Sequence, residues 1–573
     1  MRALEQWFLN ASDVVWTWII VPLVVLTALY FTIRLAAIQF RGMPHAIALL
    51  LGKNQDKDES DGITSVQALA TALSGTTGIG NIAGVAVAIK LGGPGAIFWM
   101  WVAALLGMSI KYAEGVLGSL YRQEIGRGGN VEMGGGPMYY IVGGLGEKWR
   151  GLATLYAVLS AVACLGAWNM FQSNQASATM EVYFDIPRWI TGVVMAFFVG
   201  IVLIGGIRRI SRVAERLIPS MVTVYVGGVL IICLLNVTEI PSVIAIIVKD
   251  AFGLDAAGTG TAITALLYGM RRAVFSNEAG TGSAAIAHAA AHTRHPVQQG
   301  YVASLGPFID TLIICAATAF VIILAGFHDN GSYRNQTANL MPSAGVEATV
   351  NENDQVILRL PLAAIDPAAR VSDYDAIRLS ATTDAEGLEA TLVSASGETL
   401  ASQTMTSEGL WESPNQFTVL EMPSSVSESL SSTTLEVSLK GEGELSLSSV
   451  HMVSNLNGIA LTAAAFASYS QIFGAIFIPI AALLFAYTTV LAGHYYGEIS
   501  CHFLSERIVK PYLWLYVLAT FLGCVANLGL VINFSDLALG LMCIPNLIAI
   551  VLLSGQIRSQ TAEYQHLLRG RKD

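Results

Sequence analysis

The sequence predicts an all-α polytopic membrane protein of eleven transmembrane helices, arranged as a 5+5 inverted repeat and carrying an inserted extracytoplasmic domain that resembles a β-sandwich. Three observations predict this fold class. The 573 residues are 54% hydrophobic and 13% charged, whereas soluble proteins carry about 25% charged residues. The apolar residues fall in runs of about 20, which can cross a hydrocarbon layer about 30 Å thick. The acidic residues gather in one segment. Composition therefore excludes a soluble enzyme, a nucleic-acid binder and a disordered scaffold.

Eleven hydrophobic runs are long enough to form transmembrane helices. Basic residues gather in every second connection, from Arg34 and Arg41 after the first run to Arg569 and Arg571 after the last. Because such connections stay in the cytoplasm, the alternation predicts an outside N-terminus and a cytoplasmic C-terminus. The first run lacks a small-residue cleavage site, so we expect it to be retained as a span. The runs lie near residues 14–38, 62–90, 95–121, 151–175, 188–207, 214–236, 260–290, 300–325, 474–497, 512–531 and 536–556.

The segment 327–457 differs from the rest of the chain in charge. It holds 18 acidic and five basic residues, a balance of −13 within a net charge of −10, so the remainder carries +3. Stretches such as 355–360 and 434–439 alternate apolar and polar residues between turn signals, which predicts an antiparallel sandwich. Because the eighth run leads outward, we expect a cap or spacer outside the membrane or, alternatively, a binding domain. The predicted domains are 1–326 with spans one to eight, 327–457, and 458–573 with spans nine to eleven and the C-terminal tail.

Neither the cysteines nor the histidines indicate a resident cofactor. All six cysteines lie in hydrophobic runs, at spacings typical of neither a disulfide framework nor a zinc site. His288, His292 and His295 could bind a metal by their spacing, but no fourth ligand accompanies them, and a solvated helix end is the preferred interpretation. No nucleophile, base and orienting group stand at a recognisable catalytic spacing. We therefore expect neither an enzyme nor a bound cofactor.

Two hydrophobic runs are interrupted by glycine and polar residues. The interruption at 72–81 reads Ala-Leu-Ser-Gly-Thr-Thr-Gly-Ile-Gly-Asn, and the one at 275–283 reads Phe-Ser-Asn-Glu-Ala-Gly-Thr-Gly-Ser. They occupy corresponding places in spans two to six and seven to eleven, whose predicted topologies are opposite. Broken helices at matching places in inverted repeats indicate the binding site of a secondary transporter. The alternative interpretation is tight helix packing through small residues.

A helix that breaks within the membrane frees peptide groups that lipid cannot satisfy, so a break is stable only where it lines a cavity or a ligand. Glycine permits the unwinding. The freed amides and the helix dipole suit a carboxylate, and freed carbonyls with nearby hydroxyls suit a sodium ion. The groups available are Thr76, Thr77, Gly78 and Gly80 in the first interruption and Asn277, Gly280 and Gly282 in the second.

Two further spans contribute polar side chains. Gln172, in the amide-rich stretch 169–175 of span four, could bond a polar substrate. Thr488 and Thr489 of span nine could complete an ion site with the carbonyls of span two, although a helical Thr can instead bond its own backbone one turn back. Charged residues inside spans tend to pair or mark a pathway, and we interpret Glu278 as a support for the second break and not as a proton carrier. The other intramembrane charges are Lys111, Glu114, Arg271, Arg272 and Asp310.

Four stretches, 73–86, 92–96, 268–283 and 286–290, resemble the alanine or glycine:cation symporter family. The resemblance covers 60–325 and 458–556 but leaves out the acidic segment. It implies a leucine-transporter-like fold with alternating access in a bacterial inner membrane. It also implies a small neutral amino acid bound at mid-membrane and Na⁺, less often H⁺, as the driving ion.

The resemblance also implies roles for individual residues. The substrate site would be lined by Thr76, Thr77, Gly78, Gly80, Gln172, Phe275, Asn277 and Gly280, and the candidate sodium site by Ser74, Thr77, Thr488 and Thr489. One departure from the family pattern Thr-Thr-x-Leu-Gly-Trp-x-Tyr-Tyr-Gly-Glu matters, because this chain has Gly493 at the Trp. Loss of that ring predicts a wider pocket, so Gly493 joins the substrate site, and Gly493→Trp is expected to narrow the substrate range.

The function predicted from these features is a secondary symporter that couples inward Na⁺ movement to the uptake of alanine or glycine. The alternative in the same class is a larger neutral amino acid such as glutamine. From other classes, a channel would need a continuous polar pore, and a membrane receptor would use the outer domain as its sensor. We expect a monomer whose partners are the amino acid, Na⁺ and lipid, with no nucleic acid.

Overall fold

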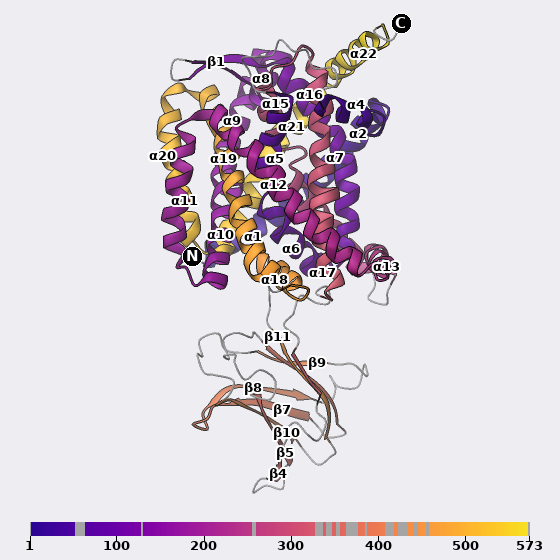
Figure 1. Ribbon diagram of the computed structural model, residues 1–573, viewed down its shortest axis with the longest axis vertical. Helices are drawn as coiled ribbons and strands as arrows, with labels where there is room; N and C mark the ends of the chain where they lie inside the picture. Colours follow the sequence, from indigo (N-terminus) through magenta and orange to yellow (C-terminus); the bar gives the residue numbers. More distant parts are fainter. Residues whose placement is uncertain are drawn as a thin grey trace. The chain divides into compact units, whose positions relative to one another are not determined.

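The computed structural model describes residues 2–51, 64–127, 130–254, 259–326, 336–339, 347–350, 356–362, 376–383, 387–406, 417–421, 432–440, 445–453, 458–470 and 472–570. The chain forms two compact units. One unit joins Met1–His328 with Gly458–Asp573, and the other is Asp329–Asn457. The first is built from helices and the second from strands (Figure 1).

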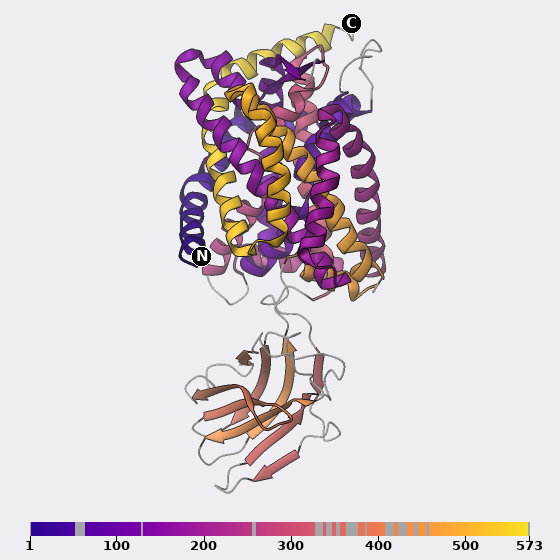
Figure 2. The same ribbon diagram turned by 90° about the vertical axis from the view of Figure 1, so that its left-hand side faces the viewer.

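The helical unit contains twenty-two α-helices among its described residues. Before the strand unit they are α1 (Arg2–Val15), α2 (Val21–Arg34), α3 (Ile38–Arg41), α4 (Met43–Leu50), α5 (Ser65–Thr76), α6 (Ala83–Gly92), α7 (Gly95–Leu120), α8 (Pro137–Leu145), α9 (Arg150–Leu165), α10 (Phe171–Phe184), α11 (Arg188–Leu203), α12 (Gly206–Leu235), α13 (Ile240–Ala251), α14 (Thr259–Asn277), α15 (Ser283–Ala289), α16 (Pro296–Pro307) and α17 (Ala316–Leu324). After it come α18 (Ile459–Ala467), α19 (Ile478–Leu504), α20 (Glu506–Val525), α21 (Leu528–Leu552) and α22 (Ser554–Gly570). In Figure 2, α22 lies across one end of this unit.

Short segments of different helical pitch join or interrupt these helices. Wide, π-helical turns matter most, because each adds a residue to the helix and redirects the side chains that follow, often at functional sites. They are η1 (Trp16–Ile20), η4 (Gly166–Met170), η5 (Phe308–Cys315) and η10 (Phe473–Phe477), while the 3₁₀ turns are η2 (Ile79–Asn81) and η3 (Glu147–Trp149). A hairpin of β1 (Gln123–Arg127) and β2 (Asn130–Gly134) completes the unit.

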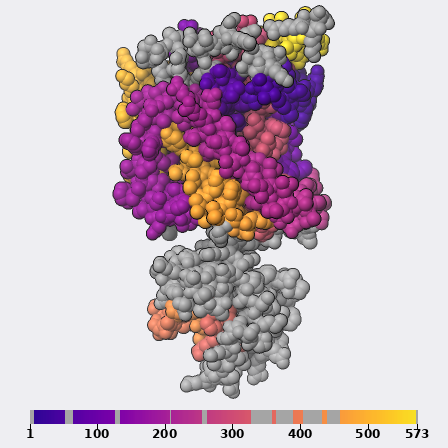
Figure 3. Space-filling model, viewed as in Figure 1, coloured from indigo at the N-terminus to yellow at the C-terminus, as the bar shows by residue number. Residues whose placement is uncertain are grey.

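Eight helices in the described residues are long and apolar enough to cross a membrane, and a ninth is added if α5 and the segment Ile79–Gly92 count as one bent span. Helix α11 is apolar but shorter. Large apolar side chains on this unit face outward, among them Trp189 and Phe197 on α11 and Trp514 on α20. Figure 3 shows one face of the molecule, where magenta side chains from the middle of the chain adjoin orange ones from the region of α18. An apolar exterior of this kind suits contact with lipid.

The first predicted interruption is present. Helix α5 begins with a capping box, in which Thr64 and Gln67 each accept a hydrogen bond from the other's backbone amide. The helix stops at Thr76 and the chain resumes through η2, with a bend of 63° between the two parts. Gly78 at the bend has an extended backbone, with φ −123° and ψ −159°. The sequence therefore identified this break correctly.

The second predicted interruption is also present. Helix α14 ends at Asn277, and α15 begins at Ser283. Gly280 and Gly282 have φ of +98° and +83°, a region that side chains disfavour. Glu278 also has a positive φ of +56°, which is uncommon for a residue other than glycine and marks a position held by its surroundings.

The strand unit has two antiparallel sheets among its described residues. One has the order β4-β5-β10-β7-β8 and the other β3-β11-β6-β9. In the first sheet, alternate residues such as Ala390 and Leu392 on β7 and Leu435 and Val437 on β10 are buried, so one face of this sheet is apolar. The strands are β3 (Gln336–Asn339), β4 (Glu347–Val350), β5 (Val356–Pro361), β6 (Ala376–Thr383), β7 (Gly387–Val393), β8 (Thr399–Thr406), β9 (Phe417–Glu421), β10 (Thr434–Lys440) and β11 (Leu445–Val453).

Candidate functional site

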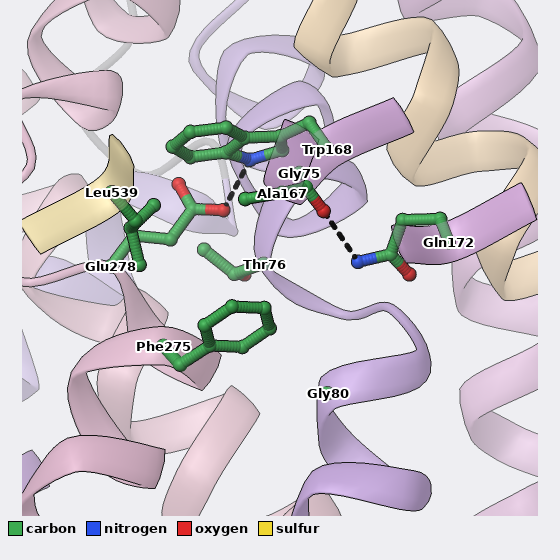
Figure 4. A pocket seen from close by; sticks show the side chains of 9 residues that line it. All are labelled: Gly75, Thr76, Gly80, Ala167, Trp168, Gln172, Phe275, Glu278 and Leu539. Atoms are coloured by element: carbon green, nitrogen blue, oxygen red, sulfur yellow. Dashed lines mark hydrogen bonds between the residues drawn. The ribbon is translucent and has the colours of Figure 1, made fainter. Parts of the chain in front are cut away.

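A small cavity lies where the two interrupted helices approach each other (Figure 4). Its empty volume, together with the open space that adjoins it, is about 260 Å³. Each break supplies part of the wall, and η4, α10 and α21 supply the rest. The lining residues are Gly75, Thr76, Gly80, Ala167, Trp168, Gln172, Phe275, Glu278 and Leu539.

The first break is held mainly by neutral groups. Gln172 accepts a hydrogen bond at 3.0 Å from the amide of Ile79 and donates one at 3.1 Å to the carbonyl of Ala167. The amide of Gly78 donates to the side-chain oxygen of Asn81 at 3.2 Å. A Cβ on Gly78 would lie 2.6 Å from the Thr489 hydroxyl oxygen, so only glycine fits there. Gln172 thus both lines the cavity and fixes the shape of the unwound backbone.

The second break is held by a buried carboxylate. One oxygen of Glu114, on α7, accepts hydrogen bonds at 3.0 Å from the amides of both Gly280 and Gly282 and at 2.8 Å from the side-chain amide of Asn546. The Asn546 amide also donates to the Gly280 carbonyl at 2.8 Å. Asn277 accepts a hydrogen bond from the amide of Ala279 at 3.0 Å. The peptide groups freed by this break are therefore largely engaged within the protein.

Glu278 brings a carboxyl group into the cavity wall. Its side chain accepts hydrogen bonds from the Trp168 indole nitrogen at 2.6 Å and from the Ser283 hydroxyl. Only 2% of the residue is exposed. A buried carboxylate is stable when it is hydrogen-bonded or paired with a cation, and it can accept more than two bonds. Glu278 therefore supports the second break, as expected, and its carboxyl group also lines the cavity.

The candidate sodium-site residues separate into two places. Ser74 donates to the Thr488 carbonyl at 2.7 Å, and Thr489 donates to the Ser74 carbonyl at 2.9 Å, so α5 and α19 are joined there. The Thr488 hydroxyl instead bonds the carbonyl of Phe485 on its own helix at 3.0 Å. Thr77 lies apart from this junction. The two threonines of span nine therefore differ in what their hydroxyls contact.

Thr77 belongs to a cluster around Asp310, a fully buried residue in η5. The Thr77 hydroxyl lies 3.5 Å from one Asp310 carboxylate oxygen, to which the Asn81 amide donates at 2.5 Å. The Ser276 and Thr311 hydroxyls donate to the other oxygen at 2.6 and 3.2 Å. This cluster joins span eight to both breaks through neutral donors.

A network of ion pairs lies beside the cavity on α14. Asp536 accepts hydrogen bonds from Arg271 at 2.7 Å and from Arg272 at 2.5 Å, and Arg271 also pairs with Asp13 at 2.7 Å. The Arg272 guanidinium stands 5.2 Å from the centre of the Phe275 ring, a cation–π arrangement. The intramembrane arginines are thus paired, and one of them contacts an aromatic wall of the cavity.

The predicted substrate-site residues are divided by the structure into two groups. Those that line the cavity are Thr76, Gly80, Gln172 and Phe275, and those outside its lining are Thr77, Gly78, Asn277, Gly280 and Gly493. Gly78, Asn277 and Gly280 shape the breaks themselves. Gly493 does not open the cavity as expected, because Trp168 fills the space beside it. The lining residues that sequence reasoning did not assign to the substrate are Gly75, Ala167, Trp168, Glu278 and Leu539.

Comparison of the sequence with known proteins relates the chain to transporters. A sequence model of the sodium:alanine symporter family matches residues 1–363 and 431–573. The sodium/alanine symporter AgcS of Methanococcus maripaludis is 32% identical over 562 residues, which cover 97% of this chain and 96% of AgcS. The probable sodium/glutamine symporter GlnT of Bacillus subtilis is 29% identical over 568 residues, covering 98% and 91%. An uncharacterised transporter of Haemophilus influenzae is 44% identical over 317 residues, covering 54% and 68%.

Proposed function

Because the chain belongs to the sodium:alanine symporter family, we propose that it couples the inward movement of Na⁺ to the uptake of a small neutral amino acid, alanine or glycine. One observation carries the proposal. Two helices, far apart in the sequence, are interrupted beside the same small cavity. Such breaks are stable within a multi-pass membrane protein where they line a cavity or a ligand, and paired breaks of this kind bind substrate and ion in secondary transporters.

The polarity of the first break suits a zwitterion. Helix α5 presents its C-terminal, electronegative end to the break, and η2 with α6 presents an N-terminal, electropositive end. The carboxylate of an amino acid binds at the second of these ends, as anions do at helix N-termini. The ammonium group then lies toward Glu278, the charged residue among the cavity lining. One amino acid thus connects the two breaks.

For the ion, we propose Ser74, Thr488 and Thr489 of the candidate set, without Thr77, because the Thr77 hydroxyl lies at Asp310. Its support is the junction of α5 and α19, where two hydroxyls and two carbonyls already converge. A desolvated Na⁺ at the C-terminal end of α5 would take these oxygens as ligands and fix the first break in its binding shape. Ion and amino acid then stabilise each other's bound state, and a coupling of about 1–3 kcal/mol is sufficient. H⁺ is the alternative driving ion.

The topology that goes with this function also remains a proposal. It has eleven spans in a 5+5 inverted repeat, with an outside N-terminus, residues 327–457 outside and a cytoplasmic C-terminus, in a bacterial inner membrane. The protein works as a monomer. The support for this topology is that every second connection between spans is rich in basic residues. Labelling single cysteines, one per connection, from either side of the membrane tests every connection separately.

Glutamine is the second candidate cargo. The observation in its favour is the likeness to GlnT over 98% of the chain. Against it, the Trp168 and Phe275 rings both line the cavity, which leaves little room for a long side chain. A channel and a receptor with an outer sensor domain are the alternatives from other classes. Saturable, stereoselective uptake separates a carrier from a channel, and uptake that survives deletion of 330–455 separates it from a receptor.

The test is uptake of labelled alanine into proteoliposomes. With Na⁺ outside and none inside, we expect accumulation above equilibrium, which collapses when an ionophore dissipates the sodium gradient. A matched experiment with a proton gradient and no Na⁺ identifies the driving ion. Alanine uptake that is the same with and without the sodium and proton gradients contradicts the proposal. A panel of unlabelled amino acids as competitors then ranks alanine and glycine against glutamine.

A further inference from the structure

A side chain at position 493 would occupy the same space as the Trp168 side chain. Gly493 lies in α19, and a Cβ built on it would come within 2.2 Å of the Trp168 Cβ and within 2.7 Å of the Tyr516 hydroxyl oxygen. Real Cβ atoms do not approach so closely. The Tyr516 hydroxyl is the far end of its side chain and can shift, whereas the Trp168 Cβ is fixed to the backbone and cannot. With Trp168 in place, every residue larger than glycine at 493 requires a rearrangement. The two positions are therefore coupled, although 325 residues separate them in the sequence.

We propose that Trp168 is the specificity-determining residue of the cavity and takes the place of the tryptophan that the family pattern has at position 493. The inference rests on the proposed function. It states that span four supplies this aromatic wall of the cavity in this chain, and that the wall restricts the cargo to amino acids with small side chains.

The surroundings of Trp168 support this role. The residue lies in the π-helical turn η4, directly before α10, and such a turn redirects side chains relative to a regular helix. Its indole is 2% exposed and lines the cavity. It packs edge-on against Tyr496 with ring centres 6.0 Å apart. In Figure 4 the indole and the Phe275 ring lie on opposite sides of Thr76. Two aromatic rings thus bound the space beside the first break.

The hydrogen bond from the indole to Glu278 gives this wall a second property. It joins η4 to the residue that directly follows α14, at 2.6 Å. Trp168 is therefore tied to the second break as well as facing the first. The ring excludes large side chains, while its N–H orients the carboxylate toward which the cargo's ammonium group points. Replacing Trp168 by Phe removes the hydrogen bond to Glu278 and keeps most of the exclusion of large side chains.

The experiment uses four full-length variants: Trp168→Gly, Trp168→Phe, Gly493→Trp and the double variant W168G/G493W. Thermal stabilisation of the purified protein by glycine, alanine, leucine, glutamine and phenylalanine, each titrated with Na⁺ present, measures binding without requiring transport. Gly227→Trp is the control for a large insertion, because a Cβ at Gly227 meets no atom within 4 Å. Trp514→Gly is the control for loss of an indole, since Trp514 is 64% exposed.

We expect Trp168→Gly to bind leucine and phenylalanine at least about tenfold more tightly than wild type does, because a pocket discriminates by about tenfold or more per methylene group. Trp168→Phe keeps the narrow range but binds alanine about tenfold more weakly, since a hydrogen bond to a charged group is lost. Gly493→Trp alone lowers the unfolding temperature. The double variant recovers the unfolding temperature of wild type and binds the same narrow range of amino acids.

Two results overturn the inference. The first is a ligand profile of Trp168→Gly that equals that of wild type, including the case in which neither protein responds to bulky amino acids. The second is a double variant no more stable than Gly493→Trp. A failure of the proposed function looks different: wild type binds alanine, and the variants change its range, but a sodium gradient drives no uptake into proteoliposomes.

Discussion

The two interrupted helices differ in how their free peptide groups are satisfied. At the first break the partners are neutral amides, with Gln172 and Asn81 each holding one backbone amide. At the second break a buried carboxylate, Glu114, holds two amides and the Asn546 side chain with one oxygen. Interactions with an ionised group are roughly twice as strong as neutral ones. On the proposed function, we infer that the second break is a fixed scaffold, whereas the first exchanges internal partners for cargo and ion.

The largest expected effect tests the scaffold. Glu114→Ala leaves the amides of Gly280 and Gly282 and the Asn546 side chain without their acceptor, and each buried donor left unpaired costs about 1–3 kcal/mol. We expect Glu114→Ala to lower the unfolding temperature in detergent strongly or to abolish folded protein in the membrane. Glu114→Gln retains an oxygen and is expected to lose less.

The control for this prediction is Glu563→Ala, which removes an exposed carboxylate from α22. It is expected to leave the unfolding temperature within about 1 °C of wild type, since exposed substitutions change stability by about 0.5 kcal/mol or less. Equal stability of Glu114→Ala and Glu563→Ala contradicts the view of the second break as a scaffold held by charge.

A pair of variants, one in each break, gives the next largest effect. Gln172→Ala removes a cavity-lining group that also holds the Ile79 amide, and we expect alanine affinity to fall about tenfold. Asn277→Ala acts indirectly, through the Ala279 amide, and is expected to reduce affinity about threefold. Both proteins should reach the membrane in normal amounts. Binding titrations with alanine check this order. A larger loss of alanine affinity in Asn277→Ala than in Gln172→Ala would show that the second break, and not the first, contributes more to binding.

The smallest expected effect concerns the ion. The Thr489 hydroxyl bonds the carbonyl of Ser74 on α5, whereas that of Thr488 bonds its own helix. We expect Thr489→Val to raise the Na⁺ concentration for half-maximal uptake about fivefold and Thr488→Val to change it less than twofold. Both substitutions replace threonine by valine, and they lie at adjacent positions of the same helix, α19. A change of less than twofold for both variants would show that neither hydroxyl belongs to the ion site, and equal large changes would contradict the distinction between them.

Sequence reasoning found the breaks because their signal is local. The glycines at 78, 280 and 282 stand where the chain leaves the helical conformation or where a side chain does not fit, and the neighbouring Thr and Asn residues distinguish these glycines from packing glycines. Capping at Thr64 likewise follows from the four residues beside it. These parts of the fold depend on neighbours in the chain, so they can be predicted from it.

The cavity wall was harder to predict because it depends on packing between distant segments. A tryptophan in an apolar run is typical of a helix core, and no periodicity indicates the π-helical turn that redirects Trp168. The absence of a ring at Gly493 predicted more space, but the space is filled from another span. Thr77 was grouped with Ser74 by sequence proximity, yet unwinding of the helix turns Thr77 toward Asp310. A change of backbone direction at the break separates residues that are neighbours in sequence.

Hydrogen–deuterium exchange can distinguish a first break that binds cargo and ion from a second break that serves as a fixed scaffold. The exchange rates of backbone amides in 72–82 and 275–283 are compared in the absence of ligand, with Na⁺, with alanine, and with both. We expect Na⁺ and alanine together to slow exchange in 72–82 more than either does alone, while 275–283 stays protected in all four conditions. Ligand-dependent protection confined to 275–283, or unchanged exchange in 72–82, would show that the first break does not bind cargo and ion.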